Sequence, residues 1–229
     1  MQSLDSLALV SGIAVASGVN VYAAVFTLGI FALTGHVELP AGLEVLSDPL
    51  VLGAAGLMYC VEFFADKIPG LDSLWDAIHT FIRIPAAIVL SASAAGDVSP
   101  ELTFAAALIG GSLATASHAT KASSRLVINS SPEPVSNWTA SIGEDLAVIA
   151  GLWTALNYPI LFLVILAIII LVMVWLLPKL WRGVKQLWQI LRSFGRRTPI
   201  SVISAENKSE LLIEPSVTKM KHFETKDKP

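Results

Sequence analysis

Four ionisable residues at helical spacing are the strongest chemical signal in this chain. Asp72, Asp76, His79 and Arg83 are separated by four, three and four residues. At about 100° per residue they fall within one narrow stripe of an α-helix, and the opposite face of that helix is apolar. Such a helix turns its ionisable stripe towards protein or water and its apolar wall towards lipid. We therefore expect the four side chains to face a polar interior.

Two further carboxylates precede this stripe. Glu62 and Asp66 are four residues apart, and the tight connector 67–70 allows their face to meet the stripe. An ionised side chain at the centre of a bilayer costs about 2.5–3.5 kcal/mol, so it must be paired, hydrated or bound to an ion. Carboxylates beside a histidine can bind a cation or relay protons, and the candidate cofactor is a divalent metal ion. The predicted metal ligands are Glu62, Asp66, Asp72, Asp76 and His79. The alternative is that Asp72 and Asp76 lie solvated near the cytoplasmic interface, and that Arg83 pairs with Asp76 or Asp72.

Polar residues also interrupt two other apolar stretches, at Ser17-Gly18-Val19-Asn20 and at Ser117-His118-Ala119-Thr120-Lys121. Broken membrane helices expose backbone groups that coordinate ions and anionic substrates. The alternative role for these residues is hydrogen bonding between neighbouring helices. An acidic pair, 144–145, lies in a later apolar stretch and needs cationic partners. The predicted substrate or ion pathway comprises Ser17, Asn20, Arg83, Ser117, His118, Thr120, Lys121, Glu144 and Asp145.

The composition requires a lipid environment. Of the 229 residues, 54% are hydrophobic and only 14% are charged, against about 25% charged residues in a soluble domain. The lipid bilayer is therefore the expected partner, and nucleic acid is not. The N-terminus has no basic segment, so the first apolar stretch is predicted to be retained rather than cleaved. The single cysteine, Cys60, excludes an intramolecular disulfide and is predicted to be a small buried hydrophobe.

The apolar stretches predict an all-α, polytopic membrane protein with about six transmembrane helices. The predicted spans are residues 7–33, 50–64, 71–94, 102–120, 138–158 and 160–177. Lys and Arg are absent from the first 66 residues and gather near 67, near 121–125 and after 178. Because cytoplasmic loops are enriched in these residues, six alternating spans place both termini in the cytoplasm.

This topology gives the two halves of the chain opposite orientations. Helices one to three and four to six are then predicted to form a 3+3 inverted repeat, an arrangement found in many transporters. Residues 13–17 and 113–117 align in support of the repeat. The predicted domains are a transmembrane domain at 1–178, a basic amphipathic interfacial helix at 179–197 and a disordered cytoplasmic tail at 198–229.

Several segments together resemble a known family. They are residues 17–22, 62–69 and 72–80 in the first half, and residues 118–122, 125 and 130–134 in the second. The segment 62–69, Glu-Phe-Phe-Ala-Asp-Lys-Ile-Pro, is the most distinctive of them. The chain resembles, over about residues 7–158, a bacterial integral-membrane family designated domain of unknown function 4126. The resemblance implies a multi-pass protein of the bacterial inner (cytoplasmic) membrane and implies no activity.

The sequence leaves three functions open. The predicted one is a transporter or channel for a small ion or solute, coupled to a cation or a proton, and not an enzyme. A metal-dependent membrane enzyme acting on a lipid head group is the first alternative. The second is a non-catalytic scaffold whose buried charges form a structural network. The chain carries no Walker-type loop, GxSxG or HExxH motif, and assembly into a homo-oligomer is left open.

Overall fold

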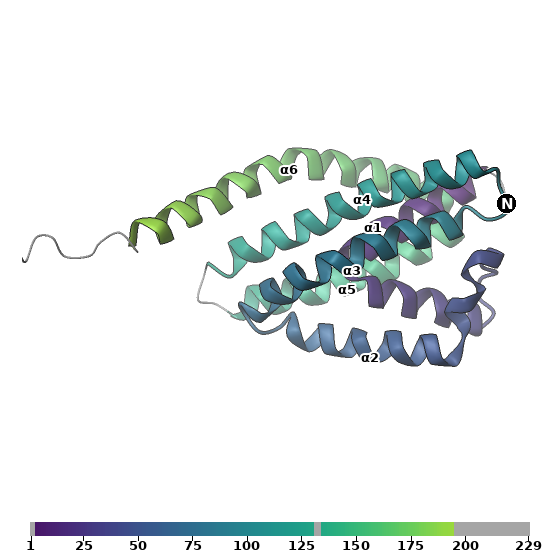
Figure 1. Cartoon of the computed structure of the whole chain (residues 1–229), viewed down its shortest axis with the longest axis horizontal. Coiled ribbons are helices and arrows are strands. Elements are labelled where there is room, and N and C mark those ends of the chain that lie inside the picture. Colours follow the sequence, from purple (N-terminus) through teal and green to yellow (C-terminus); the bar gives the residue numbers. More distant parts are fainter. Residues whose placement is uncertain (1–2, 131–133, 195–229) are drawn as a thin grey trace, which may run out of the picture. The chain divides into compact units, whose positions relative to one another are not determined.

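The structure, a computed structural model, describes residues 3–130 and 134–194, and in this part of the chain it contains helices and no β-strand (Figure 1). The elements are α1 (Ser3–Leu33), the 3-10 helix η1 (Ala41–Ser47), α2 (Pro49–Ala65), α3 (Leu71–Ala94), α4 (Pro100–Ile128), α5 (Pro134–Asn157) and α6 (Pro159–Phe194). The chain divides into two units, residues 1–185 and 186–229. All the predicted functional residues belong to the first unit, whereas the predicted tail 198–229 lies outside the described residues.

Helix α1 folds back on itself at Asn20. The backbone dihedrals of Asn20, φ −153° and ψ 100°, are not helical. A Cβ on Gly12 would lie 2.8 Å from Ala155 Cβ, and the Phe31 ring contacts the Trp153 ring with 5.4 Å between centroids. In one straight helix Gly12 and Phe31 would be about 28 Å apart, at about 1.5 Å per residue, yet their partners are two residues apart on α5. The two halves of α1 are therefore antiparallel arms of a hairpin.

The two arms of this hairpin pack against different helices. The first arm, residues 3–19, packs along α4, where Lys121 Nζ donates to the Val19 carbonyl at 3.1 Å. The second arm, residues 21–33, packs against η1 and α2, where Gly29 lies directly against the η1 backbone. Both ends of α1 therefore lie at the end of the bundle where α2 begins, and the tip of the hairpin lies inside the bundle.

Cap and turn residues determine where α2 and α3 begin. The Asp48 side chain accepts a hydrogen bond from Leu50 N at 2.8 Å, and Pro49 occupies the first turn of α2, a favoured combination at a helix start. Gly70 precedes α3 with φ +86°, a left-handed conformation that glycine adopts without strain. The short connector between α2 and α3 therefore reverses the chain directly. This reversal brings the end of α2 beside the ionisable stripe of α3.

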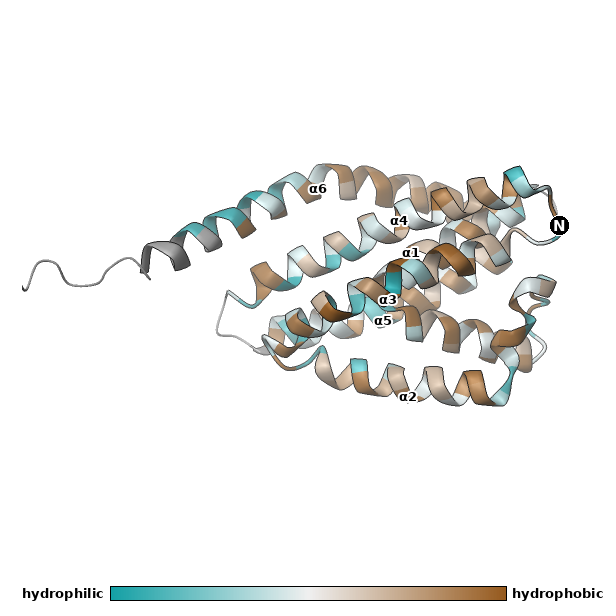
Figure 2. Ribbon diagram, in the orientation of Figure 1, coloured by the Kyte–Doolittle hydropathy of each residue, from teal (hydrophilic) through white to brown (hydrophobic). Residues whose placement is uncertain are grey.

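The exposed side chains are largely apolar, whereas the interior holds polar groups. Phe81 and Leu50 are each 83% exposed, yet Arg83, two residues after Phe81, is fully buried. Figure 2 shows hydrophobic residues along the outward surfaces of α2 and the first part of α6. This distribution suits a lipid environment. Cys60 is exposed on α2, so the prediction that it is buried was wrong; it belongs to the apolar outer face rather than to the core.

Four helices in the described residues are long and apolar enough to cross a membrane: α1, α3, α4 and α6. The bent pair η1–α2, with an angle of 68°, is a fifth candidate. The predicted count of six spans is not confirmed. Helix α5, which carries Glu144 and Asp145, is not among the candidates, and α1 begins and ends at the same end of the bundle.

Two further expectations differ from the structure. Helix α4 continues without a break through residues 117–121. Thr120 Oγ1 there donates to Ala116 O of the same helix at 2.8 Å, whereas His118 and Lys121 bond to neighbouring helices, so none of these side chains requires a break in α4. The break in α1 thus has no counterpart in α4, and the inverted repeat is not shown. Helix α6 also continues through Pro178 to Phe194 instead of ending before a separate amphipathic helix. Residues 195–197 of that predicted segment lie outside the described residues.

Candidate functional site

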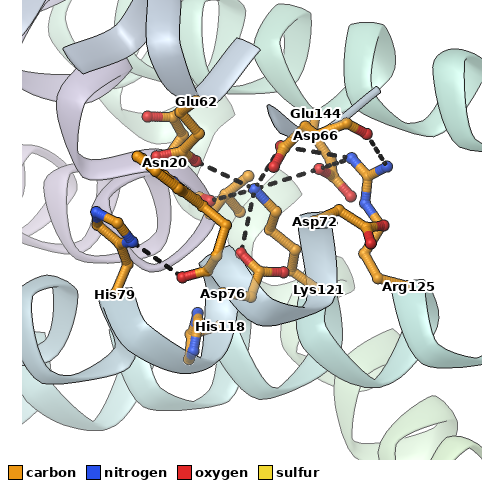
Figure 3. A network of polar contacts seen from close by, with 12 residues as sticks. Asn20, Glu62, Asp66, Asp72, Asp76, His79, His118, Lys121, Arg125 and Glu144 are labelled. Atoms are coloured by element: carbon orange, nitrogen blue, oxygen red, sulfur yellow. Dashed lines mark hydrogen bonds and ion pairs between the residues drawn. The ribbon is translucent and has the colours of Figure 1, made fainter. Parts of the chain in front are cut away.

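Ionisable side chains from the helices α2 to α5 meet inside the bundle. We call seven ion-paired residues the central network, namely Glu62, Asp66, Asp76, Arg83, Lys121, Arg125 and Glu144. Six of the side chains are at most 4% exposed, and only Glu144 reaches 20%. Figure 3 shows the carboxylates of this network gathered around the amine of Lys121. The interior predicted from the α3 stripe is therefore a dense cluster of opposite charges.

Lys121 lies at the centre of the network. Five oxygen atoms surround its Nζ, namely Asp66 Oδ2 at 2.9 Å, Val19 O at 3.1 Å, Glu62 Oε1 at 3.2 Å, Glu144 Oε2 at 3.6 Å and Asp76 Oδ1 at 3.7 Å. An ammonium group has three protons to donate. The three nearest oxygens use these protons, and the two more distant carboxylates contribute mainly by charge.

Arg83 joins two of these carboxylates. Its Nη2 donates to Glu62 Oε1 and its Nη1 donates to Asp76 Oδ1, both at 2.6 Å. Nη1 also lies 3.3 Å from His118 Nδ1, which must accept. His118 Nε2 lies 2.7 Å from Thr80 Oγ1, a hydroxyl that itself donates to the Asp76 carbonyl. These directions place the proton on Nε2, so His118 is neutral and adds no charge to the network.

Arg125 closes the network on the side of α5. Its Nη2 donates to Glu144 Oε2 at 2.6 Å and lies 3.6 Å from Asp66 Oδ2. Its Nη1 donates to the backbone carbonyl of Asn137 at 3.0 Å and to the Asn137 side-chain oxygen. Neither Arg125 nor Asn137 was predicted as a site residue. The signal for Arg125 was available, because it follows Lys121 by four residues and so shares its face of α4.

The same contacts stabilise the tip of the α1 hairpin. Asn20 Oδ1 accepts from Ala23 N at 2.9 Å, the geometry of a helix N-cap for the second arm. Lys121 donates to the Val19 carbonyl at the C-terminal end of the first arm, where the helix dipole favours a cation. Asn20 Nδ2 also donates to Asp145 Oδ1 at 3.4 Å. Backbone groups on both sides of the break in α1 therefore have hydrogen-bond partners.

The central network has more acids than bases. It contains four carboxylates and three cationic side chains, and the adjoining His118 is neutral. Three buried carboxylate oxygens, Glu62 Oε2, Asp66 Oδ1 and Asp76 Oδ2, have no hydrogen-bond partner among the described residues. Buried charge is costly unless it is paired. Full balance therefore requires one proton or one additional cation.

The other predicted residues lie around the central network. Asp72 accepts two hydrogen bonds from Asn129 Nδ2, at 2.7 and 2.9 Å. His79 stacks on Trp75, with 4.0 Å between ring centroids, and its Nδ1 contacts the Trp75 carbonyl. Asp72 and His79 thus contact residues outside the central network. Ser117 Oγ donates to Val15 O at 3.1 Å, and Ser17 is fully buried.

These positions lend no support to a metal centre. Within residues 3–130 and 134–194, no group of three or more His, Cys, Asp or Glu side chains could hold a metal ion. The cations Arg83, Lys121 and Arg125 stand between the carboxylates and pair with them. The ligand set predicted from the sequence stays a prediction without geometric support: Glu62, Asp66, Asp72, Asp76 and His79.

Comparison with known proteins returns one family. The family model described as "Domain of unknown function (DUF4126)" matches residues 7–179. No curated protein and no solved structure matches the chain. The matched range includes every residue of the central network, the second arm of the α1 hairpin and the first arm from residue 7 onward.

Proposed function

We propose a function from the geometry of the site, because the chain belongs to the DUF4126 family and that description assigns no activity. The proposed function is transport of a small ion across a membrane, coupled to binding of a proton or a cation at the central network. The long apolar helices support a membrane location. The network supplies the polar interior that an ion needs in order to leave water.

The charge imbalance of the network carries this proposal. A purely structural network would be most stable with equal numbers of acids and bases, because every unpaired buried charge is costly. Here four carboxylates face three cations, and three carboxylate oxygens have no donor in the part of the chain that the structure describes. A proton or cation that balances this charge can also exchange. The 20% exposed side chain of Glu144 supports access from that edge of the network.

The α1 hairpin supports the same function. Transporters place ion sites at discontinuous helices near the middle of the bilayer, where exposed carbonyls and helix ends contribute to binding. The Val19 carbonyl at the hairpin tip contacts Lys121 of the network. The tip is enclosed by protein, since Ser17 and Asn20 are at most 1% exposed. Non-helical backbone at membrane depth is tolerated under that condition.

We propose an orientation with the α2–α3 connector and the end of α4 in the cytoplasm, since the connector includes Lys67 whereas the loops at the other end of the bundle, 34–48 and 95–99, contain no Lys or Arg. The hairpin then requires a change to the predicted topology. Both ends of α1 lie at the opposite end of the bundle, so the N-terminus is placed outside the cytoplasmic membrane. The basic segment after residue 178 stays inside. The prediction that both termini are cytoplasmic assumed that α1 crosses the bilayer once.

Transport is tested with purified protein in lipid vesicles. A gradient of K⁺, Na⁺ or choline is imposed in turn, while internal pH is followed with a trapped dye and cation uptake with isotopes. We expect flux of a proton or a cation above that of empty vesicles, and a loss of at least about tenfold in Glu62→Gln, which removes a charge at the centre. The exposed Glu101→Gln is the matched control and should retain the wild-type rate.

Two results would reject transport. One is wild-type flux no greater than that of empty vesicles for protons and every cation. The other is a Glu62→Gln variant that loses thermal stability while its flux, per folded molecule, equals that of the wild type. The second result would identify the central network as a scaffold.

A further inference from the structure

The surroundings of Lys121 Nζ have the form of a cation site. Val19 O, Asp66 Oδ2 and Glu62 Oε1 lie 2.9–3.2 Å from the nitrogen, and two further carboxylate oxygens lie at 3.6 and 3.7 Å. A helix-end carbonyl combined with carboxylates is the donor set that transporters use for alkali cations. The ammonium group is itself the cation bound there in this structure.

The unused donor atoms point to a ligand beyond the lysine. The carboxylates of Glu62, Asp66 and Asp76 are 0%, 3% and 1% exposed as residues. Each has one oxygen bound to a cation of the network and one buried oxygen without a partner in the described chain. Figure 3 shows these side chains directed towards the Lys121 amine. Free lone pairs on the residues that surround a cation provide the coordination that an exchanging ion requires.

The present occupant indicates the class of ion. The nearest oxygens accept hydrogen bonds of 2.9–3.2 Å from the Lys121 ammonium, so the site accommodates a monovalent cation of that size. No grouping in the described residues suits a metal held by three or more His, Cys, Asp or Glu ligands. Among free monovalent ions, K⁺ resembles the bound ammonium group in charge and size.

We propose that Lys121 is a tethered occupant of a monovalent-cation site, and that a free cation of about the size of K⁺ exchanges with its ammonium group at the oxygens of Val19, Glu62 and Asp66. This inference rests on the proposed function and names its substrate class. Lys121 then serves as an internal counter-ion, which holds the hairpin tip whenever the site has no free cation. Displacement of the lysine releases the Val19 carbonyl, so cation binding acts directly on the tip of α1.

The test removes the tethered cation and asks whether a free one replaces it. Lys121→Met keeps most of the side-chain volume without the charge. The melting temperature of the purified variant in detergent is measured in KCl and in choline chloride at equal ionic strength. We expect a saturable rise of about 5–10 °C at K⁺ concentrations about 100 times Kd. Lys67→Met is the matched control and should show no K⁺-dependent rise, since Lys67 Nζ bonds to Phe63 O and Ser141 Oγ outside the network.

Other outcomes of this measurement also decide the proposal. A rise with Mg²⁺ or Ca²⁺ but not with K⁺ would overturn it, and so would a melting temperature equal in KCl and choline chloride. If Lys121→Met aggregates in choline chloride, folding in KCl supports the site and aggregation in both salts overturns it. Because binding is measured at equilibrium in detergent, it is independent of vesicle flux. Flux by the wild type without K⁺ binding by Lys121→Met would reject this inference and leave transport standing.

Discussion

Replacement of Arg83 by methionine should destabilise the protein more than any exposed substitution. Arg83 is fully buried and donates to Glu62 and Asp76 at 2.6 Å each. Without it, Glu62 keeps one partner, Lys121 at 3.2 Å, and Asp76 keeps the same lysine at 3.7 Å. Removing one member of a buried ion pair costs about 3–5 kcal/mol. For a chain of this size the loss corresponds to a fall in melting temperature of roughly 6–20 °C.

A double variant separates charge balance from lost packing. Arg83→Met/Glu62→Gln restores the original excess of one negative charge. Its loss of unfolding free energy should therefore be smaller, by about 1–3 kcal/mol, than the sum of the losses in the two single variants. Thermal unfolding in detergent, followed by circular dichroism, measures all three variants. Arg182→Met is the matched control, because Arg182 is exposed and bonds to the Pro178 carbonyl of its own helix. If Arg83→Met and this control have the same melting temperature, the buried ion pairs contribute no stability and the reasoning is wrong.

Two further predictions concern the α1 hairpin. Gly18→Ala should lower the melting temperature, because its Cβ would lie 1.8 Å from Ser117 Oγ and 2.4 Å from Ala114 O and overpacking costs at least about 1–3 kcal/mol. In Gly53→Ala the added Cβ would meet open space, so this variant should keep the melting temperature of the wild type. Equal falls in melting temperature in the two variants would contradict the close approach of α1 to α4. The second prediction concerns topology: epitopes at the two termini, probed in spheroplasts with an impermeant antibody, should be accessible at the N-terminus alone. Equal accessibility of both termini would exclude the hairpin topology.

The buried stripe of α3 could be predicted because it depends only on helical periodicity. Asp72, Asp76, His79 and Arg83 are all buried on one face of α3, as their spacing requires. The connector at Gly70 similarly predicts that Glu62 lies close to this stripe. Local rules were sufficient for these features, since each involves residues within about twenty positions of one another.

The roles of Lys121 and Arg125 could not be predicted in the same way. The sequence shows several carboxylates and a histidine, a pattern that favours a metal site, but it does not show which cations approach them. In the structure Lys121 reaches Asp66 from 55 residues away and Arg125 reaches it from 59. These long-range contacts convert a predicted ligand set into an ion-paired network. His79, which looks like a ligand in the sequence, instead stacks on Trp75.

The direction of α1 after its break was also beyond local rules. The polar residues 17–20 indicate an interruption, but they are compatible with a kink that continues across the bilayer. The return path depends on Gly29 meeting η1 and on Phe31 meeting Trp153 of α5. Because the first 66 residues contain no Lys or Arg, the charge rule gave no separate evidence for the location of the N-terminus.

The hairpin and the central network each require the other. Without Lys121 the Val19 carbonyl would lose its donor inside the bundle, and an unpaired buried carbonyl costs about 1–3 kcal/mol. Without the hairpin tip, the lysine would lose the only backbone carbonyl among the oxygens that surround its Nζ in the described chain. Under the proposed function, a change in the protonation or ion occupancy of the carboxylates is expected to move Lys121 and so to alter the stability of the tip. This shared hydrogen bond would then connect the proposed ion binding to the conformation of α1.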